Sequence, residues 1–228
     1  MLPFLFATAV IAADADEIPT YEETLPDTPS WGTAKKRMYG QVFHDHATTF
    51  YCGCTFEGKV PDLTSCGMAE SAVSSRAERV EVEHVVPASA FGRTRPCWAV
   101  GGREACLRDD PIFKVFHSDL HNLVPAVGFV NAVRSDYSMG LIAGDKARVG
   151  DCDFEVDNED DKVEPPVEVR GDVARMYFYV EWVYGLPLSD GQRHLFLAWH
   201  QADPVSEWEL ERDRRIERLQ GNSNPFVR

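Results

Sequence analysis

The chain has 228 residues, of which 44% are hydrophobic, and this apolar fraction is that of a folded protein rather than of a disordered chain. Its 37 acidic and 23 basic residues give a net charge of −14, which argues against a general nucleic-acid coat protein. The acids are concentrated near both ends and in residues 151–161, so the middle of the chain can still present a basic surface to a polyanion.

The N-terminus predicts export from the cell. Met1–Ala13 is apolar but too short to span a bilayer, and Ala13-Asp14-Ala15 has the small-x-small form of a signal cleavage site. We therefore expect a signal peptide over residues 1–15, an acidic N-terminal arm over 16–30 and a single folded domain over 31–228. The mature protein is expected in the periplasm or the medium, as a monomer that binds no membrane.

The first half of the domain predicts one helix and two strands. Thr33–Val42 is expected to form the helix. The β-branched and aromatic stretch Thr48–Tyr51 indicates a strand, and the period-two alternation of Arg79–Val86 indicates another. Pro87 ends this second strand, because proline has no N–H to donate to a sheet.

The middle of the chain is harder to interpret. Asp119–Asn122 is taken as the end of a further strand, and Pro125 as part of the first turn of a helix that continues to Arg134. Asp151–Asp161 alternates acidic and apolar residues at its start, which indicates a strand with a solvated acidic face. A calcium loop is the alternative, but Val156 stands where such a loop needs glycine.

The last third predicts three helices. Gly171–Tyr184 is apolar enough for a buried helix, Ser189 caps an amphipathic helix that runs to Trp199, and Pro204–Gln220 forms the third. The third helix is expected to carry an apolar stripe of Val205, Trp208, Ile216 and Leu219. No internal repeat or low-complexity linker interrupts the chain, so one α+β domain is the simplest account.

Six cysteines in an exported chain indicate disulfide bonds. The expected bridges are Cys97–Cys106 and two that join Cys52 and Cys54 to Cys66 and Cys152. The first of these closes a short loop that contains Gly101, Gly102 and Arg103. Zinc is the alternative, but the Cys52-x-Cys54 spacing is tighter than a common zinc knuckle, and no second knuckle follows.

Polar residues gather at the junctions of the central elements. Glu83 and His84 end a strand, Arg103 lies in the disulfide loop, and Asn131 lies on the next helix. A carboxylate and an amide suit Mg²⁺, a histidine can deprotonate water, and an arginine can bind a phosphate. These residues therefore predict phosphodiester hydrolysis. Since adjacent strand residues point to opposite faces, Glu83 and His84 share a site only where the strand twists or bulges.

The ordered motifs EHVVPASAFG (83–92), CWAVGGREAC (97–106) and DLHNLVPAVGFVN (119–131) resemble the bacterial endonuclease I family. Its members are periplasmic or secreted nucleases with a ββα-metal site, also called a His-Me finger. Residues 49–54, 164–180 and 208–227 extend the resemblance over most of the domain. It implies an α+β fold in which a ββα-metal core is surrounded by helices and held by disulfides.

The resemblance also implies the roles of the central residues. Glu83 and Asn131 would bind one Mg²⁺ ion, for which Mn²⁺ or Ca²⁺ could substitute. His84 would be the general base, and Arg103 would hold the phosphate.

Other residues would support the site or the substrate. Asn122 would brace the loop between the two strands, and His121 would have a structural or supporting role. Phe129 and His117 stand where the family pattern leads us to expect acids. Candidates for contacts with the substrate backbone are Lys35, Lys36, Arg37, Arg93, Arg95 and Arg134.

The sequence thus predicts an exported, Mg²⁺-dependent endonuclease that hydrolyses DNA, and RNA as well, without sequence preference and with 5′-phosphate products. The alternative is a catalytically inactive secreted protein that binds nucleic acid or acts as an adhesin on the same scaffold. A third hypothesis, a calcium-tuned enzyme, needs a metal at Asp151–Asp161. No G-x-S-x-G elbow, P-loop or G-x-G-x-x-G motif supports a serine hydrolase or a nucleotide-driven enzyme.

Overall fold

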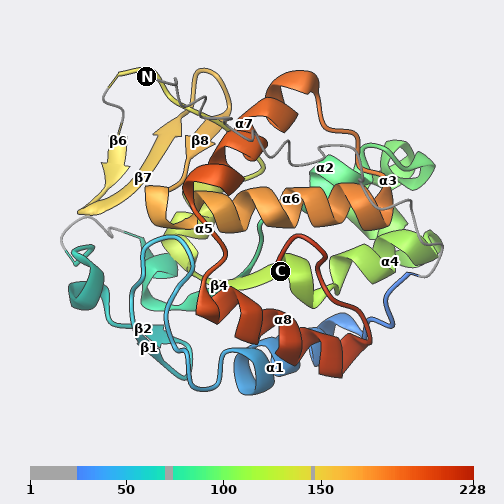
Figure 1. The fold of residues 1–228 in the computed structure, drawn as a ribbon, viewed down its shortest axis with the longest axis horizontal. Helices are drawn as coiled ribbons and strands as arrows, with labels where there is room; N and C mark the ends of the chain where they lie inside the picture. The colour runs from blue at the N-terminus through green and yellow to red at the C-terminus, as the bar shows by residue number, and fades with distance from the viewer. Residues whose placement is uncertain (1–24, 70–73, 145–146) are drawn as a thin grey trace, which may run out of the picture.

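A two-stranded antiparallel ribbon of β3 (Val80–His84) and β4 (Leu123–Val127) lies at the centre of the fold (Figure 1). The structure is a computed structural model that describes residues 25–69, 74–144 and 147–228, so the expected signal peptide lies outside the described residues. The two strands pair in one continuous register. The strand predicted at Arg79–Val86 is therefore confirmed.

The helix α5 (Gly128–Arg134) follows β4 directly and completes a β-β-α unit with the ribbon. Pro125 was expected in the first turn of this helix, and this is wrong, because it lies within β4 opposite Val82. In the sheets of the described residues β4 pairs only with β3, so its proline removes no hydrogen bond from a second strand. The strand expected to end at Asp119–Asn122 is also wrong: a 3-10 turn, η4 (Leu120–Asn122), leads into β4 instead.

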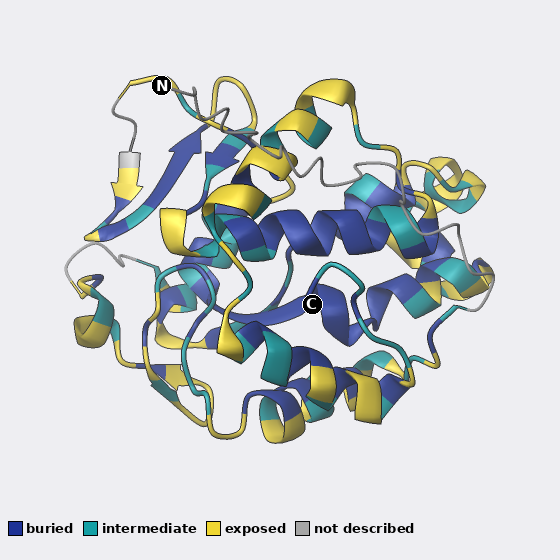
Figure 2. Ribbon diagram, in the orientation of Figure 1, coloured by how far each residue is buried: buried dark blue, intermediate teal, exposed yellow. Residues whose placement is uncertain are grey.

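The three predicted C-terminal helices are confirmed. α6 (Arg170–Tyr184) is buried along most of its length, and α7 (Asp190–Ala202) and α8 (Glu207–Gln220) lie on either side of it with exposed outer surfaces (Figure 2). α7 and α8 each begin with a serine that forms a capping box, Ser189 and Ser206.

The inner face of α8 carries charged residues as well as apolar ones, and the expected apolar stripe did not include these charged residues. Glu209, Arg212 and Asp213 are buried beside Ile216. The Arg212 guanidinium donates 2.9 Å hydrogen bonds to the carbonyl oxygens of Leu120 and His121. These bonds fix the turn that delivers the chain into β4.

A second sheet has the strand order β5-β8-β7-β6, built from β5 (Ser138–Met139), β8 (Lys162–Glu164), β7 (Cys152–Asp157) and β6 (Ala147–Val149). A strand was expected here, and it is confirmed, but its acidic face is only partly solvated, since the Asp153 side chain is 45% exposed while its neighbours on that face are not. Glu155 and Asp157 are buried, and Arg148 Nε lies 3.2 Å from Glu155 Oε1. No group of three or more His, Cys, Asp or Glu side chains in the described ranges is arranged to hold a metal ion.

The segment before the ribbon contains a helix but not the strand expected at Thr48–Tyr51. α1 (Trp31–Arg37) and the π-helix η1 (Met38–Val42) confirm the predicted helix. Thr48 forms only an isolated bridge, and the backbone N–H groups of Thr49 and Phe50 donate to Cys54 and Pro125. The remaining elements are β1 (Phe56–Glu57), β2 (Val60–Pro61), η2 (Leu63–Cys66), η3 (Ser75–Glu78), α2 (Ala88–Gly92), α3 (Pro96–Asp109), α4 (Pro111–His117) and η5 (Val167–Val169).

Three disulfides join parts of the chain that are distant in sequence or held in tight turns. They are Cys52–Cys152, Cys54–Cys66 and Cys97–Cys106, so the expected pairing is confirmed. Among the residues that the structure describes, no helix has the length and apolar character needed to cross a membrane.

Candidate active site

His84 is the last residue of β3, and its ring has one polar partner among the residues that the structure describes. Nε2 lies 2.9 Å from the carbonyl oxygen of His117, at the end of α4. Because a carbonyl oxygen only accepts hydrogen bonds, Nε2 must carry the proton, and a neutral ring then has its lone pair on Nδ1. This tautomer suits a base that acts through Nδ1.

An aromatic group surrounds the His84 ring. The ring centroids of Trp31 and His117 lie 5.3 and 4.8 Å from that of His84. Burial, assisted by electrostatic repulsion from His117 and Arg103, lowers the pKa of His84 to about 3. The imidazole is therefore neutral at neutral pH, with one nitrogen unprotonated, which is the state that a general base requires.

Arg103 approaches His84 from a kink in α3. The kink lies at Gly101 and Gly102, and Gly102 has a φ of 58°, in the left-handed region that favours glycine. The Cys97–Cys106 disulfide spans this bend. Arg103 is exposed, and no acidic side chain of the described residues forms an ion pair with it. Its guanidinium is thus free to bind an anion near the His84 ring.

Glu83 points to the other face of β3, since the register shows no bulge between it and His84. Its Oε1 accepts a 3.0 Å hydrogen bond from the Tyr51 hydroxyl and lies 2.8 Å from Arg134 Nε. Burial raises the pKa of Glu83 to about 7, while the guanidinium of Arg134 acts in the opposite direction. Both contacts are made by Oε1, and Oε2 takes part in neither of them.

Arg134 corrects one of the sequence predictions. It was expected to contact the substrate backbone, but its side chain is fully buried. Besides Glu83, its guanidinium meets the carbonyl oxygens of Val85 at 2.6 Å and Tyr137 at 3.1 Å. Arg134 therefore neutralises a buried carboxylate within the protein and is not available to an external phosphate.

Asn131 lies on α5 and contacts Glu81, which is two residues before Glu83 and on the same face of β3. Its Nδ2 donates a 3.1 Å hydrogen bond to Glu81 Oε2. Glu81 and Glu83 are at positions i and i+2 of the strand, which share one face about 6.6 Å apart. Glu83 and Asn131 therefore come from elements that pack together, as one binding site requires.

These residues fit Mg²⁺ better than zinc. The described part of the chain lacks the cluster of histidines, cysteines or acids that zinc sites need. A carboxylate oxygen of Glu83 and the amide oxygen of Asn131 are hard ligands, and no described residue donates a hydrogen bond to Asn131 Oδ1. A magnesium ion usually takes few protein ligands and keeps several waters, so two such oxygens are an adequate set.

A model of the Endonuclease I family matches residues 32–228, a range that contains Glu83, His84, Arg103 and Asn131. The chain belongs to the endonuclease I family. An extracellular deoxyribonuclease of Aeromonas hydrophila is 45% identical over 199 residues, which cover 85% of this chain and 87% of that protein. A periplasmic deoxyribonuclease of the same species is 44% identical over 199 residues, with 85% and 84% covered. Endonuclease-1 of Buchnera aphidicola is 42% identical over 183 residues, with 78% and 73% covered.

Membership of the endonuclease I family makes the chain a nuclease. Its relatives are named as extracellular or periplasmic proteins, in agreement with the export expected from the N-terminus. The α+β fold with three disulfides also agrees with the expectation from the resemblance.

Asn122 and His121 lie next to each other but have different surroundings in this endonuclease I fold. The Asn122 carboxamide forms two hydrogen bonds with the backbone of Val86: it accepts from the N–H at 2.8 Å and donates to the carbonyl oxygen at 2.9 Å. It thereby ties the segment after β3 to the turn before β4. His121 is fully buried against the C-terminal segment, where its Nε2 lies 3.1 Å from the carbonyl oxygen of Asn222.

The other basic residues expected to contact substrate differ in their availability. Arg93 and Arg95 form ion pairs with Asp136 and Asp110 at 2.6 and 2.7 Å. Arg37 donates a 2.9 Å hydrogen bond to the carbonyl oxygen of Leu219. Lys36 is exposed, and Lys35 Nζ lies 5.2 Å from the Trp31 ring centroid.

Sequence reasoning missed four residues that build the site, namely Trp31, Tyr51, Glu81 and His117. Glu81 had a usable signal, because the alternation of β3 places it on the face of Glu83. His117 was noticed only as a departure from the family pattern, although its backbone carbonyl holds the His84 ring. Trp31 and Tyr51 gave no local signal, since each meets the site only through tertiary packing.

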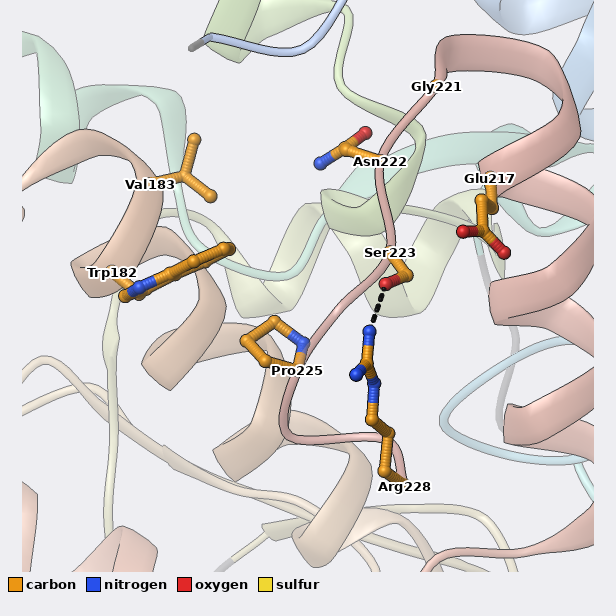
Figure 3. A pocket seen from close by; sticks show the side chains of 8 residues that line it. All are labelled: Trp182, Val183, Glu217, Gly221, Asn222, Ser223, Pro225 and Arg228. Atoms are coloured by element: carbon orange, nitrogen blue, oxygen red, sulfur yellow. Dashed lines mark hydrogen bonds between the residues drawn. The ribbon is translucent and has the colours of Figure 1, made fainter. Parts of the chain in front are cut away.

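The predicted site residues do not line the pocket at the C-terminus. This pocket, of about 260 Å³, lies between the end of α6 and the C-terminal segment (Figure 3). Trp182 forms one wall, and Arg228 donates a 2.7 Å hydrogen bond to Ser223 on another.

Proposed function

We propose that this chain is an exported, Mg²⁺-dependent endonuclease that hydrolyses DNA without sequence preference. The observation that carries the proposal is His84, whose Nε2 is held by the His117 carbonyl so that Nδ1 can act as a base, near Arg103, with which no acidic side chain of the described residues forms an ion pair. The names of the relatives support DNA as the substrate. RNA belongs to the same proposal, because contacts with the phosphate backbone do not read bases.

The residues divide the reaction between them. His84 Nδ1 takes a proton from water, whose oxygen then attacks phosphorus as the bond from phosphorus to O3′ breaks. The product carries a 5′ phosphate, and the departing O3′ receives a proton from solvent. Arg103 binds the phosphate oxygens with its planar guanidinium.

Glu83 and Asn131 would hold the magnesium ion. When bound, the ion supplies positive charge for the oxygens that become more negative during the reaction. Tyr51 and Arg134 keep the Glu83 carboxylate in place. The acidic exterior of the chain contributes no attraction for DNA, so binding depends on the few cations around His84.

Supercoiled plasmid tests the proposal directly. The mature, oxidised protein is incubated with Mg²⁺ or with EDTA, and His84→Ala is compared with His44→Ala, which changes an exposed histidine. We expect nicking with Mg²⁺, none with EDTA, and a loss of about 10³-fold in rate for His84→Ala only. A structured RNA in parallel reactions tests the second substrate.

Two results contradict the proposal. Cleavage by His84→Ala at the wild-type rate excludes His84 as the base. Intact plasmid under every condition, from a protein shown to be folded, favours the inactive nucleic-acid-binding or adhesin-like alternative.

A further inference from the structure

The carboxylate of Glu81 joins three elements beside the proposed metal site. Arg76, from η3, donates from Nε and Nη2 at 3.1 and 2.5 Å, and Arg79 donates from Nε at 2.8 Å. From α5, Asn131 Nδ2 donates at 3.1 Å. Both oxygens of Glu81 are therefore occupied by donors, so this acid is engaged inside the protein and is not offered to a cation.

The same carboxylate packs against the first turn of α5. Gly128 N–H donates a 2.9 Å hydrogen bond to the carbonyl oxygen of Arg79. A Cβ at Gly128 would overlap the Arg76 carbonyl and the Glu81 carboxylate, so only glycine allows this close approach. Gly128 and Asn131 are at positions i and i+3, on one side of the helix, and both contact Glu81.

The contact determines which end of the Asn131 amide faces outward. A side-chain amide has one oxygen and one NH₂ group, and only the oxygen binds a cation. Since the NH₂ group donates to Glu81, the oxygen is the end left free, and no described residue donates a hydrogen bond to it. Without an acceptor at position 81, the amide can rotate and present NH₂ in place of oxygen.

We propose that Glu81 is a positioning residue that holds the Asn131 carboxamide with its oxygen available to the metal ion. This inference rests on the proposed function, in which Asn131 is a metal ligand. Residues that orient a metal ligand in this way typically change metal affinity by about 10- to 100-fold when they are removed. Glu81 thus prepares one ligand while Glu83, on the same face of β3, is the other.

Metal binding by the whole oxidised protein tests the inference. Mn²⁺ affinity is measured from the electron paramagnetic resonance signal of free Mn²⁺, for wild type, Glu81→Ala, Asn131→Ala and Glu211→Ala. Glu211 is a matched control, because it is another carboxylate held by two arginines, Arg214 and Arg215, on α8. The melting temperature of the metal-free protein is recorded for each variant.

We expect Glu81→Ala to weaken Mn²⁺ binding by about 10-fold, with Glu211→Ala at the wild-type value. At saturating Mg²⁺ the kcat of Glu81→Ala is expected to recover to within a few-fold of wild type, since the ligands themselves remain. If Glu81→Ala does not fold, Glu81→Gln is measured in its place. The NH₂ group of the glutamine cannot accept a hydrogen bond, so it must face at least one of the donors that Glu81 now accepts from.

Three outcomes separate this inference from the proposed function. Unchanged Mn²⁺ affinity in Glu81→Ala with weakened binding in Asn131→Ala overturns the role of Glu81 alone. Unchanged affinity in Asn131→Ala overturns the proposed metal site and the inference with it. A lower melting temperature in Glu81→Ala without a change in Mn²⁺ affinity assigns Glu81 a purely structural role and also overturns the inference.

Discussion

The two faces of β3 hold their functional side chains in opposite ways. On one face Glu81 and Glu83 are acids whose charges are balanced by arginines, and each accepts further hydrogen bonds. On the other face His84 lies among aromatic rings, and its ring has a single polar contact within the described part of the chain, the His117 carbonyl. Two residues adjacent in sequence therefore have very different surroundings.

The difference corresponds to the two chemical tasks that are proposed for the site. A cation site needs charged oxygens held in fixed positions, whereas a base needs a ring that stays neutral and keeps a lone pair exposed. Because side chains alternate along a strand, β3 separates these surroundings over one residue, from Glu83 to His84. The register of β3 shows no bulge between Glu83 and His84, so of the two conditions for a shared site only a twist of the strand remains.

The largest effect is expected on the carboxylate face. Arg134→Met leaves Glu83 buried without its counter-charge, and the free energy of unfolding should fall by about 3–5 kcal/mol. Arg79→Met is the control, because Arg79 is an exposed partner of Glu81 and its loss should cost at most about 1 kcal/mol. Urea unfolding of the metal-free, oxidised protein measures both. An equal decrease in the free energy of unfolding for both variants would show that the buried ion pair of Glu83 contributes no more than the exposed one.

A smaller effect is expected on the imidazole face, where acid should destabilise the fold. Burial, assisted by Arg103 and Lys35, lowers the pKa of His117 to about 4. Between pH 6.5 and 4 the unfolded chain binds a proton that the folded chain does not, so stability is lost as the pH falls through this range.

His117→Phe keeps a ring at this position and removes the titrating group. We expect the fall in melting temperature from pH 7 to pH 5 to be about 3 °C smaller than in wild type. His44→Phe, which replaces an exposed histidine, should retain the wild-type fall. A His117→Phe protein with the same fall as wild type would show that His117 does not contribute to the acid sensitivity.

The smallest effect is expected from the cations at the edge of the imidazole face. Lys35→Ala should raise KM for DNA about threefold and reduce the slope of log KM against log salt by about 1, as the loss of one phosphate contact predicts. Arg37→Ala removes a charge from the same helix, but Arg37 is bonded to Leu219 and should leave the slope unchanged. Salt titrations of plasmid cleavage distinguish the two. Equal slopes for both variants would count against Lys35 as a substrate contact.

Local patterns were sufficient for much of the fold. The alternation of β3, the capping serines of α7 and α8, and the even number of cysteines are properties of short segments or of simple counts. The failures fall where distant residues supply the hydrogen bonds. Thr49 and Phe50 donate to Cys54 and Pro125 instead of to a neighbouring strand, and the turn at Leu120 is held by Arg212 from α8.

The candidate site likewise has features that local sequence predicts and features that depend on distant residues. The sequence by itself selected the residues proposed to carry the chemistry, Glu83, His84, Arg103 and Asn131, because their types and order resemble the motifs of the endonuclease I family. Only the tertiary structure decided that Arg134 is a buried partner of Glu83 and that Glu81 holds Asn131. Burial and hydrogen-bond partners depend on the packing of β3 against α5 and on Tyr51, which lie far apart along the chain, and a pattern of neighbouring residues does not contain that information.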